Sequence, residues 1–68
     1  MVKLNYYKLR KILFDRNIKI SNVCKEVGLA HSVGTKINKD ESIELLTLAK
    51  ICVYLGIRIE DAVEIEKV

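Results

Sequence analysis

The chain has 68 residues, of which 50% are hydrophobic, with no proline, three glycines and a formal net charge of +3. This length fits one small domain with a marginal core and leaves no room for a substrate cleft between two lobes. The high apolar content and the few turn residues favour compact helices over a disordered tail or a many-turned β sandwich, and we predict an all-α fold over residues 1–68.

No apolar run approaches the roughly 18 residues that a membrane span requires. The N-terminal stretch MVKLNYYKLRK is interrupted by charge and by tyrosine, unlike a signal peptide. We therefore expect a cytoplasmic protein that does not engage a membrane.

The N-terminal quarter is predicted to form a short arm and a first helix. Val2–Leu4 alternates apolar and polar residues, which is typical of an extended segment. Asn5 is placed to cap a helix that runs to about Arg16. The predicted inward side of this helix consists of Tyr6, Leu9, Ile12 and Leu13, with Phe14 at the margin.

Residues 21–38 are predicted to form two helices joined by a tight turn. Ser21 is a suitable N-cap, because its hydroxyl can accept a hydrogen bond from a backbone N–H of the first turn. Gly28 is expected to end the first helix in the left-handed conformation, with Leu29 filling the corner. The second helix is predicted over Ala30–Asn38. Its polar side consists of His31, Ser32, Thr35 and Lys36. Such a helix-turn-helix can place its second helix in the DNA major groove.

The last third is predicted to contain two helices and a strand. Ser42 is placed to cap a helix over about Ile43–Leu55, and a short final helix is expected over Ile59–Val63. The broad apolar side of the longer helix consists of Ile43, Leu46, Leu48, Ile51, Cys52 and Leu55. The tail Val63–Val68 begins as the alternation of a half-buried strand, which can pair either with Val2–Leu4 or with the same tail of another subunit.

Charge is unevenly distributed along the sequence. Residues 1–39 carry nine Lys and Arg against two acids, a balance of +7, whereas residues 40–68 carry three against seven, a balance of −4. Because cations attract phosphates and acids repel them, we expect the N-terminal part to face a nucleic acid and the C-terminal part to face away.

The residues that carry catalytic or metal chemistry are sparse. The two cysteines, Cys24 and Cys52, fall on predicted apolar helix faces, so we expect reduced core residues rather than a disulfide or a zinc site. His31 has no acid placed to orient it toward a nucleophile, and the acids near the C-terminus lack the spacing of a calcium loop. We therefore expect no enzyme activity, no metal and no cofactor.

Three stretches carry a resemblance that covers nearly the whole chain: SNVCKEVGLAHSVGTKIN, LAKICVYLGI and IEDAVEI. Together they resemble the Cro/phage-repressor family of helix-turn-helix transcriptional regulators, in its small single-domain members. The resemblance implies a compact four- to five-helix, lambda-repressor-like domain that binds operator DNA, with residues 30–38 as the recognition helix.

The same resemblance implies roles for particular residues. By position in the motif, the base-contacting residues are His31, Ser32, Thr35 and Lys36. The implied phosphate-contacting residues are Ser21, Asn22, Asn38 and Lys39. Charge adds further candidates for phosphate contact, namely Lys8, Arg10, Lys11, Lys19 and Lys25. Gly34 stands where the family usually has a branched apolar residue, and it either loosens the helix or lets it pack closer.

We therefore predict a transcriptional regulator, a repressor that acts by occupying its operator. One recognition helix reads few base pairs, so we expect a homodimer on two half-sites about 34 Å apart. The dimer contact is expected from the C-terminal alternation or from the exposed part of the Ile43–Leu55 helix. No small-molecule effector is evident. The alternative is a protein-interaction module on the same fold that does not read DNA sequence.

Overall fold

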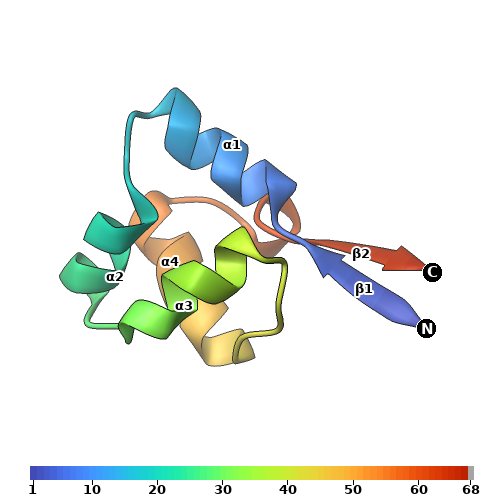
Figure 1. Cartoon of the computed structure of the whole chain (residues 1–68). Coiled ribbons are helices and arrows are strands. Elements are labelled where there is room, and N and C mark those ends of the chain that lie inside the picture. The colour runs from blue at the N-terminus through green and yellow to red at the C-terminus, as the bar shows by residue number, and fades with distance from the viewer. Residues whose placement is uncertain (68) are drawn as a thin grey trace.

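The computed structural model describes residues 1–67 and shows a helical body from which a two-stranded ribbon projects (Figure 1). The elements, in chain order, are β1 (Val2–Asn5), α1 (Tyr7–Asp15), α2 (Ile20–Val27), α3 (His31–Asn38), α4 (Leu45–Leu55), the 3₁₀ turn η1 (Ile59–Asp61) and β2 (Glu64–Lys67). The predicted helical fold with a short terminal β pairing is confirmed. Val68, the last residue of the predicted terminal strand, lies outside the described residues.

A single core joins the four helices. Its buried members are Tyr6, Leu9, Leu13, Val23, Ile37, Leu48, Ile51, Cys52, Leu55 and Ala62. Two expectations for α1 change: Ile12 is only half-buried, and Phe14 is 84% exposed rather than marginal. The reason is that α1 ends at Asp15 and the chain turns, so that Ile18 packs against the core instead.

The predicted pair of helices is present as α2 and α3, with Gly28 between them in the left-handed conformation at φ 80°. The backbone N–H of Leu29 donates to the carbonyl of Cys24 at 2.7 Å, and the Leu29 side chain packs against the core. The prediction of Ser21 as N-cap is wrong. Lys19 occupies the cap position, since Ile20 already belongs to the helix and packs against the core.

The start of α4 also differs from the expectation. The helix begins at Leu45 rather than Ile43, and Ser42 does not cap it, because Ile43 packs against the core from the preceding loop. Leu46, expected on the buried side, is 64% exposed. The predicted final helix is reduced to the single turn η1.

The two chain ends pair with each other. β1 and β2 are antiparallel, with Val2 opposite Lys67 and Asn5 opposite Glu64. Of the two pairings that the sequence allowed, the structure therefore has the one within the chain. The expected half-burial is wrong, because all four residues of β2 are exposed where the ribbon extends beyond the helices (Figure 1).

Cys24 and Cys52 are free and buried, as predicted, and burial raises the pKa of both thiols. Among the described residues, no three His, Cys, Asp or Glu side chains are grouped so as to hold a metal ion. No helix within residues 1–67 is long and apolar enough to cross a bilayer.

Candidate DNA-binding surface

One side of α3 is a polar ridge. His31, Ser32, Thr35 and Lys36 are all exposed, and at 3.6 residues per turn their spacing places them on one side of the helix. Gly34 and Ile37 on the opposite side are buried. The structure thus brings together the four residues that the sequence analysis assigned to base contact. We call them the α3 ridge.

Gly34 lets α3 lie closer to α2 than a larger, branched side chain would allow. A Cβ built on this glycine would lie 3.4 Å from Cγ2 of Ile20 and 4.0 Å from Sγ of Cys24. α3 is continuous from His31 to Asn38, so the glycine does not interrupt it. Of the two consequences considered for Gly34, the arrangement favours closer packing.

A shallow hollow of about 290 Å³ separates the α3 ridge from the start of α2. Its polar lining combines both sets of predicted contact residues: His31, Thr35 and Asn38 from α3, and Ser21 from α2. Neither helix has an acid in its first turn or a side-chain cap on its N-terminus. The positive ends of both helix dipoles are therefore not neutralised by the chain itself, which favours an approaching anion.

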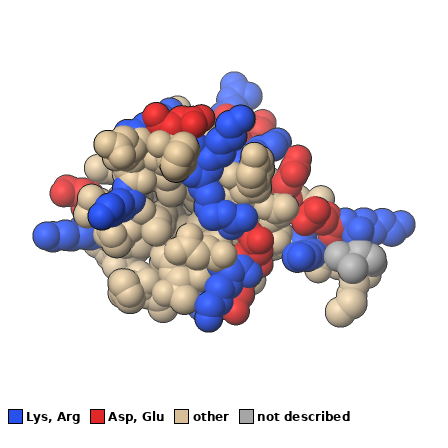
Figure 2. Space-filling model, turned by 45° about the horizontal axis from the view of Figure 1, so that its top comes forward, with Lys and Arg blue, Asp and Glu red and all other residues tan. Residues whose placement is uncertain are grey.

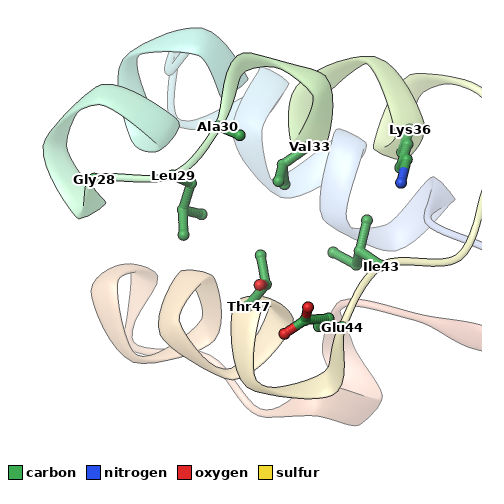
Figure 3. Close-up of a pocket in the computed structure, with 8 residues that line it drawn as sticks. All are labelled: Gly28, Leu29, Ala30, Val33, Lys36, Ile43, Glu44 and Thr47. Atoms are coloured by element: carbon green, nitrogen blue, oxygen red, sulfur yellow. The ribbon is translucent and has the colours of Figure 1, made fainter.

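A second hollow of about 280 Å³ lies on the other side of the ridge, between α3 and the start of α4. Figure 3 shows Lys36 extending from α3 toward Ile43, with Thr47 and Glu44 across from it on the α4 side. Lys36 therefore lies on the flank of the ridge that faces α4, whereas His31 and Thr35 lie on the flank that faces α2.

The two-helix segment is locally basic. Residues 19–39 contain four lysines and one acid, Glu26, a balance of +3. All four lysines are exposed: Lys19, Lys25, Lys36 and Lys39. Asn22 on α2 is also exposed. The positive charge is thus carried by the same two-helix segment that contains the ridge.

The basic N-terminal part and the acidic C-terminal part of the sequence do not form two separate surfaces of the folded protein. On the face seen in Figure 2, Lys and Arg side chains are interspersed with Asp and Glu. Two cations counted as phosphate candidates are paired with acids from the C-terminal part: Lys8 with Glu64 at 3.4 Å and Arg10 with Asp40 at 2.7 Å. The paired ribbon and the loop after α3 bring these acids back against α1.

Lys11 is set apart from the α3 ridge. It lines a hollow on α1 with Lys8, Ile12 and two acids, Asp15 and Asp61. No residue of α2 or α3 lines this hollow.

Arg10 and Asp40 fix the end of α3 to the start of α1. The Arg10 guanidinium donates to the Ile37 carbonyl at 2.8 Å and to the Asp40 carboxylate at 2.7 Å. The same carboxylate accepts from the backbone N–H of Tyr6 at 2.9 Å, and the Tyr6 hydroxyl donates to the Glu41 carbonyl at 2.8 Å. The hydrogen bond from Arg10 lowers the pKa of Asp40. Arg10 is therefore occupied in holding α3 in place.

Sequence reasoning missed two features of this surface. Nothing in the sequence pattern marks Asp40 as a partner of Arg10, because the pair joins residues 30 positions apart. Phe14 is exposed and lines a shallow hollow together with Asn38 at the end of α3, although its helical position suggested a margin of the core.

Comparison with known proteins places this surface in context. Residues 8–67 match the profile of the Cro/C1-type HTH DNA-binding domain. The chain belongs to this family. Its match over α2 and α3 makes them the helix-turn-helix of a DNA-binding regulator.

A solved structure shares the fold at the level of the whole chain. The transcriptional regulator VanUg, in its crystal form II, superposes with a TM-score of 0.90 at 33% sequence identity, over 98% of this chain and 89% of that one. A search of curated proteins gives no match.

Proposed function

We propose that this protein binds double-stranded DNA in a sequence-specific manner and represses transcription by occupying its operator. The observation that carries the proposal is the α3 ridge, four polar side chains that face solvent on a helix whose other side is buried against α2. A helix held in this way can enter the major groove as a rigid unit. Residues 1–68 act as one DNA-binding domain, and no catalytic step is involved.

In the proposed complex the α3 ridge reads base edges. Lys36 donates to guanine O6 or N7, and the hydroxyls of Ser32 and Thr35 bond to either purine or pyrimidine edges. His31 lies at the start of α3, where it contacts a base or the neighbouring phosphate. The ridge has two flanks, so Lys36 and His31 would contact different strands or successive base pairs.

Phosphate contacts fix the register of α3 in the groove. They come from the start of α2, from the end of α3 and from the exposed lysines around them. The proposed residues are Ser21, Asn22, Lys25, Lys19, Asn38 and Lys39. The support is that Ser21 and Asn38 line the hollow beside the ridge, that the other four are exposed, and that residues 19–39 carry a net charge of +3. Lys11 is left out of the complex, because it lies beside Asp15 and Asp61 in a hollow that no residue of α2 or α3 lines.

One α3 ridge contacts too few base pairs for useful selectivity, so the active species is a homodimer on two half-sites about 34 Å apart. The protein works in the cytoplasm, where it meets the chromosome, and its operator overlaps a promoter so that occupancy blocks transcription.

The test is a selection of bound sequences from random duplex DNA, followed by affinity measurements on the selected site and on scrambled duplex. Specific affinity is expected to exceed non-specific affinity by about 10³ or more at physiological salt. Repression is then tested with a reporter behind the selected site. If no sequence is enriched and retention on random duplex is lost at physiological salt, the fold serves as a protein-interaction module instead.

A further inference from the structure

α4 is apolar on two sides, although only one of them is covered. Leu48, Ile51, Cys52 and Leu55 are buried in the core. On the opposite side, the apolar residues Leu46, Ala49 and Val53 recur at i, i+3 and i+7, with the charged Lys50 beside them, followed by Tyr54. Val53 is 81% exposed and Tyr54 51%. We call these five residues the α4 outer face.

A helix that is apolar on all sides is normally covered on all sides. The α4 outer face and the end of α2 together form an open hollow of about 560 Å³, to which α2 contributes Glu26 and Val27. Contiguous apolar surface with a polar rim marks a site of protein contact. The α4 outer face therefore has the character of a protein-contact surface.

The chemistry of the rim indicates which partner fits. Glu26 and Lys50 lie on neighbouring helices at the edge of the same hollow, and neither takes part in an ion pair within residues 1–67. One acid and one base on one patch make it self-complementary. Under a twofold axis, Glu26 of one copy faces Lys50 of the other.

We propose that a second copy of this chain covers the α4 outer face, with the two α4 helices packed antiparallel around Ala49. The small Ala49 side chain lets the helices approach closely, and antiparallel packing sets Leu46 of one copy against Val53 of the other. Tyr54 closes the edge of the contact.

The contact leaves the DNA-binding surface open. No α3 residue lines the hollow at the α4 outer face, and it shares no residue with the hollows on either side of the α3 ridge. The interface itself does not depend on the proposed function. Only its assignment to the dimer that would occupy two half-sites rests on that function. Association and DNA binding are separately measurable.

The ribbon is the competing surface, because Val2 and Ile65 are also exposed there. Its edges carry Lys3, Glu64 and Glu66. Charged side chains on an edge strand oppose pairing with another chain. This makes Ile65 a matched control: it is apolar, 72% exposed and lies in β2, on the ribbon that projects from the helical body (Figure 1).

The first test is sedimentation equilibrium without DNA, over micromolar to millimolar protein, for the wild type, Val53→Glu and Ile65→Glu. The wild type is expected to approach twice the chain mass of 7.8 kDa. Val53→Glu is expected to weaken association at least about tenfold, because it buries an unpaired carboxylate, while Ile65→Glu associates like the wild type. Circular dichroism melting confirms that each variant is folded.

Two outcomes overturn the proposal: a monomeric wild type, or unchanged association of Val53→Glu. Loss of association in Ile65→Glu alone would place the contact on the ribbon instead.

A charge exchange tests the twofold arrangement. Lys50→Glu and Glu26→Lys are each expected to weaken association, and the double variant is expected to restore it. Two single losses without restoration overturn the pairing of Glu26 with Lys50. Binding of each variant to a duplex with one half-site is measured in parallel. If the protein associates but binds no DNA, the proposed function is refuted and this interface stands. If a strictly monomeric wild type binds DNA, the interface is refuted and DNA binding stands.

Discussion

Asp40 combines three roles in one residue. It adopts the left-handed conformation at φ 57°, which aspartate tolerates better than most residues. Its carboxylate accepts hydrogen bonds from Arg10 and from the backbone of Tyr6, joining the end of α3 to the start of α1. Both bonds are to a charged acceptor and are partly buried, so they are stronger than a typical surface pair. The orientation of α3 relative to α1 depends on this residue.

Asp40→Asn is expected to lower the free energy of unfolding by about 1–2 kcal/mol at neutral pH, because it weakens charge-assisted hydrogen bonds. The pKa of Asp40 is lower in the folded protein than in the unfolded chain. Its stabilisation is therefore complete above the unfolded value of about 4 and is lost as the pH falls through the folded-state value. Urea unfolding at neutral pH and at low pH measures the difference between wild type and variant, which should shrink with acid. Glu41→Gln, an exposed neighbour, is the control and should change little at either pH.

Lys36 and Lys39 differ in proposed role although they lie within one turn of each other. Lys36→Ala is expected to weaken binding to the selected site by about 1–3 kcal/mol more than binding to random duplex, because it removes a base contact. Lys39→Ala is expected to weaken both about equally and to reduce the slope of log affinity against log salt by about one. Filter binding across a salt series measures both quantities, with Lys25→Ala as a second phosphate variant. Equal effects of all three substitutions on specific and random DNA would contradict the assigned roles.

The helices themselves were largely predictable, and their first residues were not. Apolar spacing located all four α-helices, and Gly28 marked the turn between α2 and α3. The N-caps expected at Ser21 and Ser42 are wrong, because the cap position depends on where the neighbouring apolar residue packs. Ile20 enters α2 early, and Ile43 reaches the core from outside α4. Capping preference is worth about 1 kcal/mol, which is less than burying such a side chain.

Gly34 and Gly28 are expected to respond in opposite ways to substitution by alanine, because of the two only Gly28 has a positive φ. Gly34→Ala is expected to raise the free energy of unfolding by up to about 1 kcal/mol, since alanine favours a helix interior and its Cβ meets Ile20 at an ordinary contact distance of 3.4 Å. Thermal and urea unfolding measure the change. Gly34→Leu should instead destabilise, because the larger side chain would separate α3 from α2. A loss of stability in Gly34→Ala would show that the two helices are too close for a methyl group.

Gly28→Ala is expected to lower the free energy of unfolding by about 1–2 kcal/mol, because a residue with a Cβ is strained in the left-handed region. No atom lies within 4 Å of a Cβ built at Gly28, so the cost comes from the backbone alone. Gly28→Asn is the matched variant and should recover part of the loss, since asparagine adopts this conformation more readily. The same unfolding measurements apply. Equal losses for Ala and Asn would indicate that the turn, rather than its handedness, limits stability.

At the level of the whole protein, the sequence reveals charge and hydrophobicity but not where distant segments meet. The pairing of β1 with β2 brings Glu64 beside Lys8, and the loop after α3 brings Asp40 beside Arg10. A basic N-terminal part and an acidic C-terminal part therefore mix on the face seen in Figure 2. The local charge of α2 and α3 survives because those helices are adjacent in sequence. The sequence pattern placed Leu46 on the buried side of α4, because apolar spacing alone does not reveal which apolar residues another helix will cover.

The proposed dimer makes a prediction about operator geometry. If two copies associate through the α4 outer face, the α3 ridges are held at a fixed separation, and affinity depends on the spacing of the half-sites. Half-sites one helical turn apart, about 10–10.5 base pairs, are expected to bind best. Inserting about five base pairs turns the second half-site to the opposite face of the duplex and should remove the gain from simultaneous binding, which is about 10²–10⁴ for linked sites. Gel-shift titrations on a spacing series measure this dependence. Val53→Glu should bind weakly and equally at every spacing, because its two copies bind independently. A wild type that is equally insensitive to spacing would show that the two copies do not bind as one rigid unit.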